Sequence, residues 1–139
     1  MKNVMVSLIV LTALPVAALA GSYNYLSAGS VKEKIEAGER MILVDIQVEE
    51  EYAARHLPGA VATHAYPVKS DVDRQKLAAV LPMIRASAEP VVIVCPRGGG
   101  GAKRTYDYLK GQGVAEARLN ILEKGQKGWP YAKMTESGV

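Results

Sequence analysis

Short runs of consecutive apolar residues alternate with amphipathic stretches between residues 27 and 122. The clearest runs cover residues 41–46 and 91–94 and consist largely of Val, Ile and Leu. A run that is apolar at every position is typical of a strand buried on both faces, as in a parallel sheet. Residues 60–63 and 118–122 are two further short candidates. The chain therefore contains at least four predicted strands.

Helical signals fall between these runs. Ser27 is a candidate N-cap for a helix that continues to Ala37 and ends at Gly38. The other predicted helices cover residues 49–56, a stretch capped by Asp71 or Asp73 that runs to about Leu81, and residues 102–112, closed by Gly113. Strands that alternate with helices predict a single α/β domain with a mostly parallel sheet.

Composition supports one globular domain. The chain has 139 residues, of which 49% are hydrophobic and 22% charged, and these values exclude a disordered or fibrous protein. The net charge of +3 is spread along the sequence, which argues against a nucleic-acid partner. A single cysteine excludes a disulfide framework and a zinc site built from several cysteines.

Residues 1–20 have the features of a secretory signal peptide. Lys2 precedes an apolar stretch at residues 5–14, Pro15 interrupts it, and Ala18-Leu19-Ala20 forms a small-x-small cleavage site. The stretch is shorter than the ~20 apolar residues that a membrane span needs. We expect cleavage after Ala20, a periplasmic location without stable membrane insertion, and one domain over residues 21–139.

Candidate chemistry follows the strand at residues 91–94. Cys95 comes directly after it, where ligand sites of open α/β sheets lie, and Arg97 and the glycines at 98–101 lead into a helix. Glycine amides at a helix N-terminus form an anion cradle and favour a thiolate, lowering a cysteine pKa by about one to several units. The pattern indicates a thiolate nucleophile aimed at an anion, although a buried structural cysteine is the alternative.

Two other anion-binding motifs fail. A nucleotide P-loop needs Gly immediately before its Lys and Ser or Thr immediately after, whereas Lys103 lies between Ala102 and Arg104. A cysteine phosphatase has an arginine six positions after its cysteine, and that position here is Gly101.

Three motifs together resemble the rhodanese family over residues 25–131. They are Leu43-Val44-Asp45-Ile46-Gln47 with Glu51-Tyr52 and His56-Leu57-Pro58-Gly59-Ala60, then Val94-Cys95 with its glycine loop, then Lys124-Gly125-Gln126-Lys127-Gly128-Trp129-Pro130. The resemblance implies a three-layer α/β sandwich in which helices flank a five-stranded parallel sheet.

The resemblance also implies sulfur transfer through a persulfide on Cys95. The donor would be thiosulfate, a polysulfide or a related compound, and the acceptor a thiol or cyanide. Substrate binding is expected at Arg97, Gly98, Gly99, Gly100 and Gly101, with supporting positions at Asp45, Lys103 and His64. Neither histidine is spaced with other ligands for a metal, and we expect no cofactor.

Some positions depart from the family pattern. Gln47 stands where the family usually has an arginine, Lys124 replaces the first glycine of the closing motif, and the loop after Cys95 is about one residue longer. A longer loop without side chains suggests a bulkier donor, such as a polysulfide or a selenium oxyanion. A periplasmic sulfur or selenium carrier without turnover and an inactive interaction module are the alternatives, and the sequence leaves a homodimer open.

Overall fold

A computed structural model describes residues 22–139, so the predicted signal peptide at residues 1–20 lies outside the described part. Its centre is a five-stranded sheet with the strand order β1-β5-β4-β2-β3, in which every neighbouring pair is parallel. The strands are β1 (Tyr25–Leu26), β2 (Ile42–Asp45), β3 (Val61–Ala62), β4 (Val91–Val94) and β5 (Leu119–Leu122). The predicted parallel sheet is confirmed.

Helices connect the strands. The α-helices are α1 (Ala28–Glu36), α2 (Glu49–Ala54), α3 (Asp71–Ala78), α4 (Leu81–Arg85) and α5 (Gly100–Gly111). Three short 3₁₀ helices complete the described chain: η1 (Glu116–Arg118), η2 (Gln126–Gly128) and η3 (Ala132–Met134).

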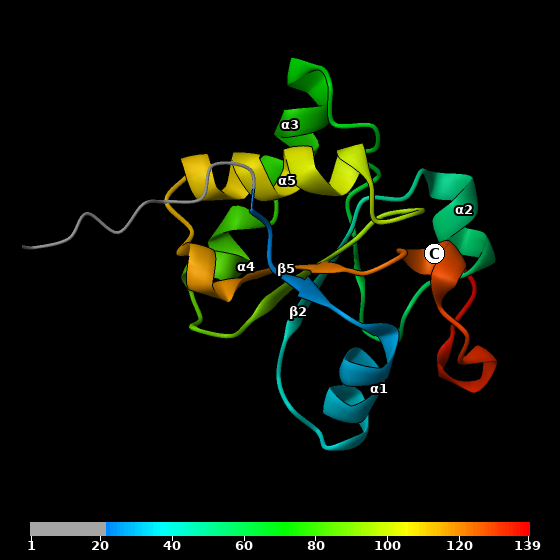
Figure 1. Cartoon of the computed structure of the whole chain (residues 1–139). Helices are drawn as coiled ribbons and strands as arrows, with labels where there is room; N and C mark the ends of the chain where they lie inside the picture. The colour runs from blue at the N-terminus through cyan, green and yellow to red at the C-terminus, as the bar shows by residue number, and fades with distance from the viewer. Residues whose placement is uncertain (1–21) are drawn as a thin grey trace, which may run out of the picture.

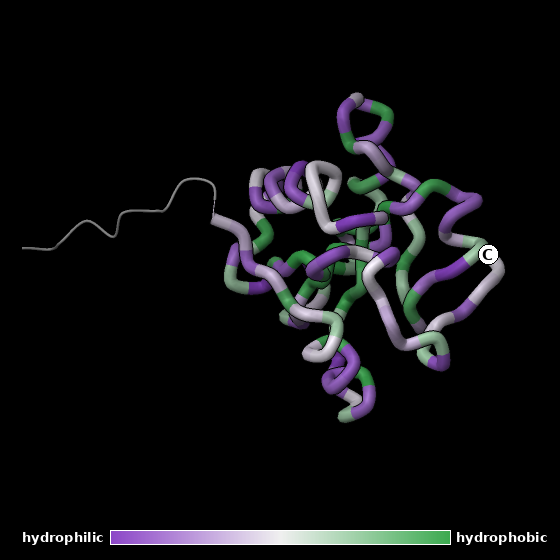
Figure 2. The backbone as a smooth tube through the Cα atoms, turned by 45° about the vertical axis from the view of Figure 1, so that its right-hand side comes forward, coloured by the Kyte–Doolittle hydropathy of each residue, from purple (hydrophilic) through white to green (hydrophobic). Residues whose placement is uncertain are grey.

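Alternate side chains of the buried strands enter two separate cores. In β4, Val91 and Ile93 pack with α3, α4 and α5, whereas Val92 and Val94 pack with α1, α2 and the segment around Trp129. This is the period of two that a strand imposes on its side chains. Figure 1 shows α5 and α1 on opposite sides of the sheet, and Figure 2 shows the hydrophobic positions gathered at its centre. The molecule is the expected three-layer α/β sandwich.

Several element boundaries differ from the sequence prediction. Helix α3 is capped by Ser70, not by Asp71 or Asp73, because Ser70 Oγ accepts from the amide of Asp73 while the Asp73 side chain accepts from the amide of Ser70. A second short helix, α4, follows α3, with Pro82 in its first turn, where a missing N–H costs nothing. Strand β1, of two residues, is not among the predicted strands.

The start of α5 also differs. The helix begins at Gly100, two residues before the predicted start, and the amide of Lys103 donates to the carbonyl of Gly99. Two of the four glycines expected in the loop therefore form the first helical turn.

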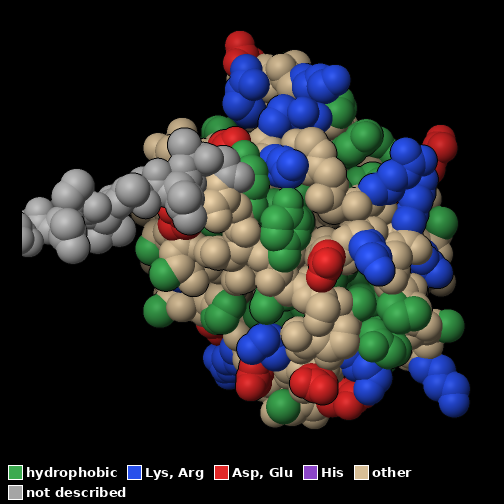
Figure 3. Space-filling view, viewed as in Figure 1, with side chains coloured by type: hydrophobic (Ala, Val, Ile, Leu, Met, Phe, Trp, Pro, Cys, Tyr) green, Lys and Arg blue, Asp and Glu red, His purple; other side chains and the backbone are tan. Residues whose placement is uncertain are grey.

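Charged residues are dispersed over the visible surface. On the face in Figure 3, Lys and Arg side chains form separate groups with Asp and Glu between them. Among residues 22–139, no helix has the length and apolar character that crossing a membrane requires.

Candidate active site

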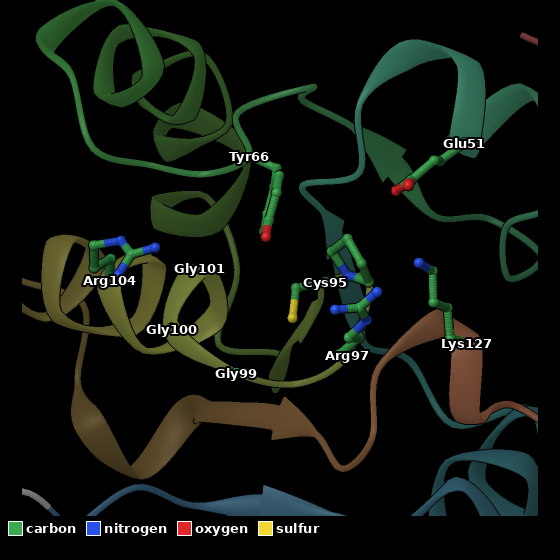
Figure 4. A pocket seen from close by; sticks show the side chains of 10 residues that line it. Glu51, Tyr66, Cys95, Arg97, Gly99, Gly100, Gly101, Arg104 and Lys127 are labelled. Atoms are coloured by element: carbon green, nitrogen blue, oxygen red, sulfur yellow. The ribbon is translucent and has the colours of Figure 1, made fainter.

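Cys95 lies immediately beyond the carboxyl end of β4, on the side of the sheet that α5 covers. Its Sγ accepts a hydrogen bond from the backbone amide of Gly98 at 2.8 Å. The residue is 2% exposed, yet Figure 4 shows its sulfur directed into a cavity. An N–H group that donates to sulfur stabilises negative charge on that atom. Cys95 thus belongs to the core on the α5 side of the sheet, and it also lines the floor of the cavity.

The cavity above this sulfur has a volume of about 350 Å³. That size lies within the range of sites that bind small molecules. Its lining comes from α2, the segment after β3, the loop after β4, the start of α5 and η2: Glu51, Tyr66, Cys95, Pro96, Arg97, Gly99, Gly100, Gly101, Arg104 and Lys127. Three of these side chains are basic and one is acidic, which makes the site favourable for an anion.

The loop after Cys95 packs backbone against backbone on the turn that follows β5. A Cβ atom at Gly98, where φ is +74°, would lie 2.9 Å from the backbone nitrogen of Lys124. The amide of Gln126 donates to the Cys95 carbonyl at 2.8 Å, and the amide of Lys127 donates to the Pro96 carbonyl at 3.0 Å. These contacts fix the direction of the Gly98 amide and hence its bond to Sγ.

The first turn of α5 forms one wall of the cavity. Its leading amides have no partner within the helix, and the helix dipole places partial positive charge there. A Cβ atom at Gly101 would lie 2.9 Å from Cδ2 of Tyr66. The glycine at 101 therefore allows the tyrosine ring to pack directly against the helix.

Tyr66 and Arg104 both pack against the first turn of α5. Tyr66 is 41% exposed, and Figure 4 shows its hydroxyl pointing toward the space above Cys95. Arg104 donates from Nε to the carbonyl of Pro67 at 3.0 Å, and its guanidinium covers Gly100. The segment after β3 thus anchors the arginine and supplies a hydroxyl donor for the site.

Asp45, one of the predicted supporting residues, lies outside the cavity and is fully buried. Its carboxylate accepts from the backbone amide of Gln47 at 2.8 Å and from Gln47 Nε2 at 2.9 Å. Burial raises the pKa of Asp45 to about 6, although both hydrogen bonds from Gln47 act in the opposite direction. This carboxylate joins the end of β2 to α2, because Gln47 Nε2 also donates to the carbonyl of Arg55.

His64 and Lys103 are not among the residues that line the cavity. His64 Nδ1 lies 3.2 Å from the carbonyl of Gln47, and the ring packs edge-on against Tyr52. Lys103 Nζ lies 5.7 Å from the centre of the Tyr23 ring. Successive helical residues are rotated by about 100°, so Arg104 faces the cavity while Lys103 does not. Of the predicted binding residues, Arg97, Gly99, Gly100 and Gly101 line the cavity, and Gly98 contributes its amide.

Five lining residues are not among the predicted site residues: Glu51, Tyr66, Pro96, Arg104 and Lys127. Glu51 and Lys127 belong to the first and third motifs, where the sequence pattern by itself indicates a structural role. Tyr66 follows β3 at the carboxyl edge of the sheet, where any side chain is a candidate in a parallel fold. Among residues 22–139, no three His, Cys, Asp or Glu side chains gather to hold a metal ion.

Solved structures share this fold. A rhodanese-like domain protein from Staphylococcus aureus is 22% identical, with 84% of this chain and 99% of that chain covered at a TM-score of 0.63. A thiosulfate sulfurtransferase from Pseudomonas aeruginosa is 23% identical over 84% of this chain and 20% of that chain, at a TM-score of 0.62. A yeast protein tyrosine phosphatase of the rhodanese family is 15% identical over 84% of this chain and 94% of that chain, also at 0.62. At these identities the likeness concerns the fold alone.

The sequence itself gives the family. No curated protein matches the chain. A family model described as a rhodanese-like domain matches residues 27–131, which is most of the chain and includes every residue that lines the cavity. The chain belongs to the rhodanese-like domain family.

Proposed function

We propose that this protein is a sulfurtransferase that carries sulfane sulfur on Cys95. The observation that carries the proposal is the Cys95 sulfur at the floor of a cationic cavity, where it accepts the Gly98 amide at 2.8 Å. A cysteine held in this way is a nucleophile for an anionic sulfur donor such as thiosulfate or a polysulfide. The acceptor is a thiol or cyanide.

With thiosulfate, the first half-reaction exchanges one sulfur–sulfur bond for another, and the second exchanges the persulfide bond for a bond from the transferred sulfur to the acceptor, S–S with a thiol and S–C with cyanide. The Cys95 thiolate attacks the outer sulfur, the bond to the inner sulfur breaks, and sulfite leaves with the electron pair. An acceptor nucleophile then attacks the outer sulfur of the persulfide, and the bond to Cys95 Sγ breaks to restore the thiolate. The charges of Arg97, Arg104 and Lys127 favour binding of the dianion, and the Gly98 amide stabilises the thiolate that forms and leaves.

A single cysteine suits this cycle. Among the residues of the chain, Cys95 has no cysteine partner for a resolving disulfide, and persulfide transfer requires none. Phosphatase chemistry is disfavoured because position 101, six after the nucleophile, is a glycine packed under Tyr66.

The test is sulfur uptake followed by turnover. After incubation with thiosulfate or polysulfide, intact-protein mass spectrometry should show an increase of about 32 Da, one sulfur atom, that cyanide removes. Cys95→Ser should abolish the increase and the formation of thiocyanate, and sulfur transfer retained in this variant would refute the mechanism. Uptake without steady-state turnover would instead identify a carrier, and no uptake from any donor an inactive module.

A second variant tests the anion site. Arg97→Met should raise KM for thiosulfate about five-fold, the effect of ~1 kcal/mol from an exposed charge. Arg40→Met is the matched control, because Arg40 is exposed in the segment before β2, far along the sheet from Cys95.

The N-terminal sequence further supports export of this activity to the periplasm. Expression with residues 1–20 in a bacterial host should yield a periplasmic protein whose first residue is Gly21, as read by N-terminal sequencing. A cytoplasmic protein that retains Met1 would contradict the location.

A further inference from the structure

The cavity is larger than the simplest donor requires. A water molecule occupies about 30 Å³ in the liquid, so the five heavy atoms of thiosulfate, counted at one water volume each, need about 150 Å³. The cavity measures about 350 Å³. An organic molecule therefore fits over the Cys95 persulfide. The charged side chains at the rim indicate which functional groups that molecule carries.

The rim contains a carboxylate that an anion site does not need. Glu51 extends from α2 into the lining, half-buried, and makes no ion pair within 4.0 Å among the described residues. Figure 4 shows Glu51 and Lys127 on the same side of the cavity, with Arg97 between Lys127 and Cys95. This acidic group lowers the affinity for a small anion, yet neither Arg97 nor Lys127 neutralises it.

We infer that the acceptor is a low-molecular-weight thiol that carries both an ammonium and a carboxylate group, such as an α-amino thiol. Its ammonium pairs with Glu51, and its carboxylate pairs with Arg97 and Lys127. Its sulfur then faces the persulfide at the cavity floor. This acceptor preference rests on the proposed function, because it concerns the second half-reaction of the same site.

The transfer step balances without a further reactant. The acceptor thiolate attacks the outer sulfur of Cys95–S–SH, forming a new S–S bond. The bond between that sulfur and Cys95 Sγ breaks, and its electron pair remains on Sγ as thiolate. The product is the persulfide of the acceptor. No net oxidation or reduction occurs.

A set of acceptors that differ in one charged group tests the pairing. Protein loaded with one sulfur from thiosulfate is mixed with cysteine, 3-mercaptopropionate, which lacks the ammonium, or cysteamine, which lacks the carboxylate. Transfer is followed as loss of the persulfide by rapid-quench mass spectrometry, with cyanide as an acceptor without either group. The measured quantity is the second-order rate constant, corrected for the thiolate fraction of each acceptor.

Glu51→Gln should lower the preference for cysteine over 3-mercaptopropionate by about five-fold, the worth of one exposed charge pair. The rate with cyanide should not fall, because cyanide has no ammonium group to pair with Glu51 and loses the repulsion from its carboxylate. Glu50→Gln is the matched control, because Glu50 is in the same first turn of α2 but is exposed and outside the cavity. Lys127→Met should lower the preference for cysteine over cysteamine, with the exposed Lys133→Met as its control.

The outcomes separate this preference from the proposed function. If loaded protein forms but the ratio of rates is the same in Glu51→Gln as in the wild type, the acceptor assignment is wrong and the sulfurtransferase stands. An equal change in Glu50→Gln would also refute the assignment, since it would reflect the general charge of α2. If no donor loads Cys95, the proposed function and the acceptor preference both fail.

Discussion

Replacement of Gly125 by alanine should lower the reactivity of Cys95, although Gly125 does not line the cavity. Gly125 lies in the turn between β5 and η2, with φ +60° and ψ −162°, a region that glycine alone adopts readily. A Cβ atom there would overlap the Cys95 carbonyl and would lie 2.6 Å from the amide nitrogen of Arg97 and 2.7 Å from that of Gly98. These are backbone atoms of the loop that holds the sulfur, so no side-chain rotation relieves the overlap.

The expected loss of stability has two parts. Backbone strain at such a position costs of order 1–3 kcal/mol, and forcing an extra carbon into a packed site costs about 1–3 kcal/mol. The unfolding free energy should therefore fall by about 2–6 kcal/mol. Relaxation also displaces the Gly98 amide from Sγ, and losing a hydrogen bond to a charged group is worth about 1.5–3 kcal/mol. Sulfur transfer should fall at least ten-fold.

Urea unfolding followed by circular dichroism measures the first effect, and alkylation of Cys95 together with kcat/KM for sulfur transfer measures the second. Gly113→Ala is the matched control, because Gly113 has φ +90° but no atom within 4 Å of an added Cβ. It should show strain without loss of activity. If Gly125→Ala loses no more stability than Gly113→Ala and alkylates at the wild-type rate, the proposed coupling between this turn and the nucleophile is wrong.

Three further substitutions test other parts of the molecule. Because burial raises the pKa of Asp45 from 3.8 to about 6, its contribution to stability is complete below pH 4 and is lost as pH rises through 6. At 1.36 kcal/mol per pKa unit, the unfolding free energy of the wild type should fall by about 3 kcal/mol as this contribution is lost. Urea unfolding of Asp45→Asn between pH 4 and 7 should show no such fall. A pH dependence in the variant equal to that of the wild type would contradict this role of Asp45. Tyr66→Phe should lower kcat/KM for sulfur transfer about three- to ten-fold without a change in unfolding free energy, since one hydrogen bond is lost; wild-type kinetics would show that the hydroxyl does not contact the substrate. Trp129→Ala, at a side chain 2% exposed, should cost about 3–5 kcal/mol of unfolding free energy, and a loss under 1 kcal/mol would show that the closing motif is not part of the core.

Local sequence patterns determined the scaffold. Residues 91–94 are apolar at every position because both faces of β4 are covered, and this requirement is visible in the sequence alone. The place of Cys95 follows directly, since the residue after a buried parallel strand must lie at the carboxyl edge of the sheet. The N-cap at Ser27 is equally local, because its side chain accepts from the amide of Ser30 three residues later.

The composition of the cavity was decided by tertiary structure. Glu51, Tyr66 and Lys127 come from three separate segments, and they meet above Cys95 because α2, the segment after β3, and η2 all follow strands that end at one edge. The residues next to Lys103 and Arg104 in the sequence do not indicate which of the two faces the cavity. The rotation along α5 directs Arg104 toward the cavity and Lys103 away from it. A strand or a cap depends on neighbours within a few residues, whereas the charge pattern of a site depends on where distant segments pack. The sequence therefore placed Cys95 at the edge of the sheet, and the fold selected the side chains that surround it.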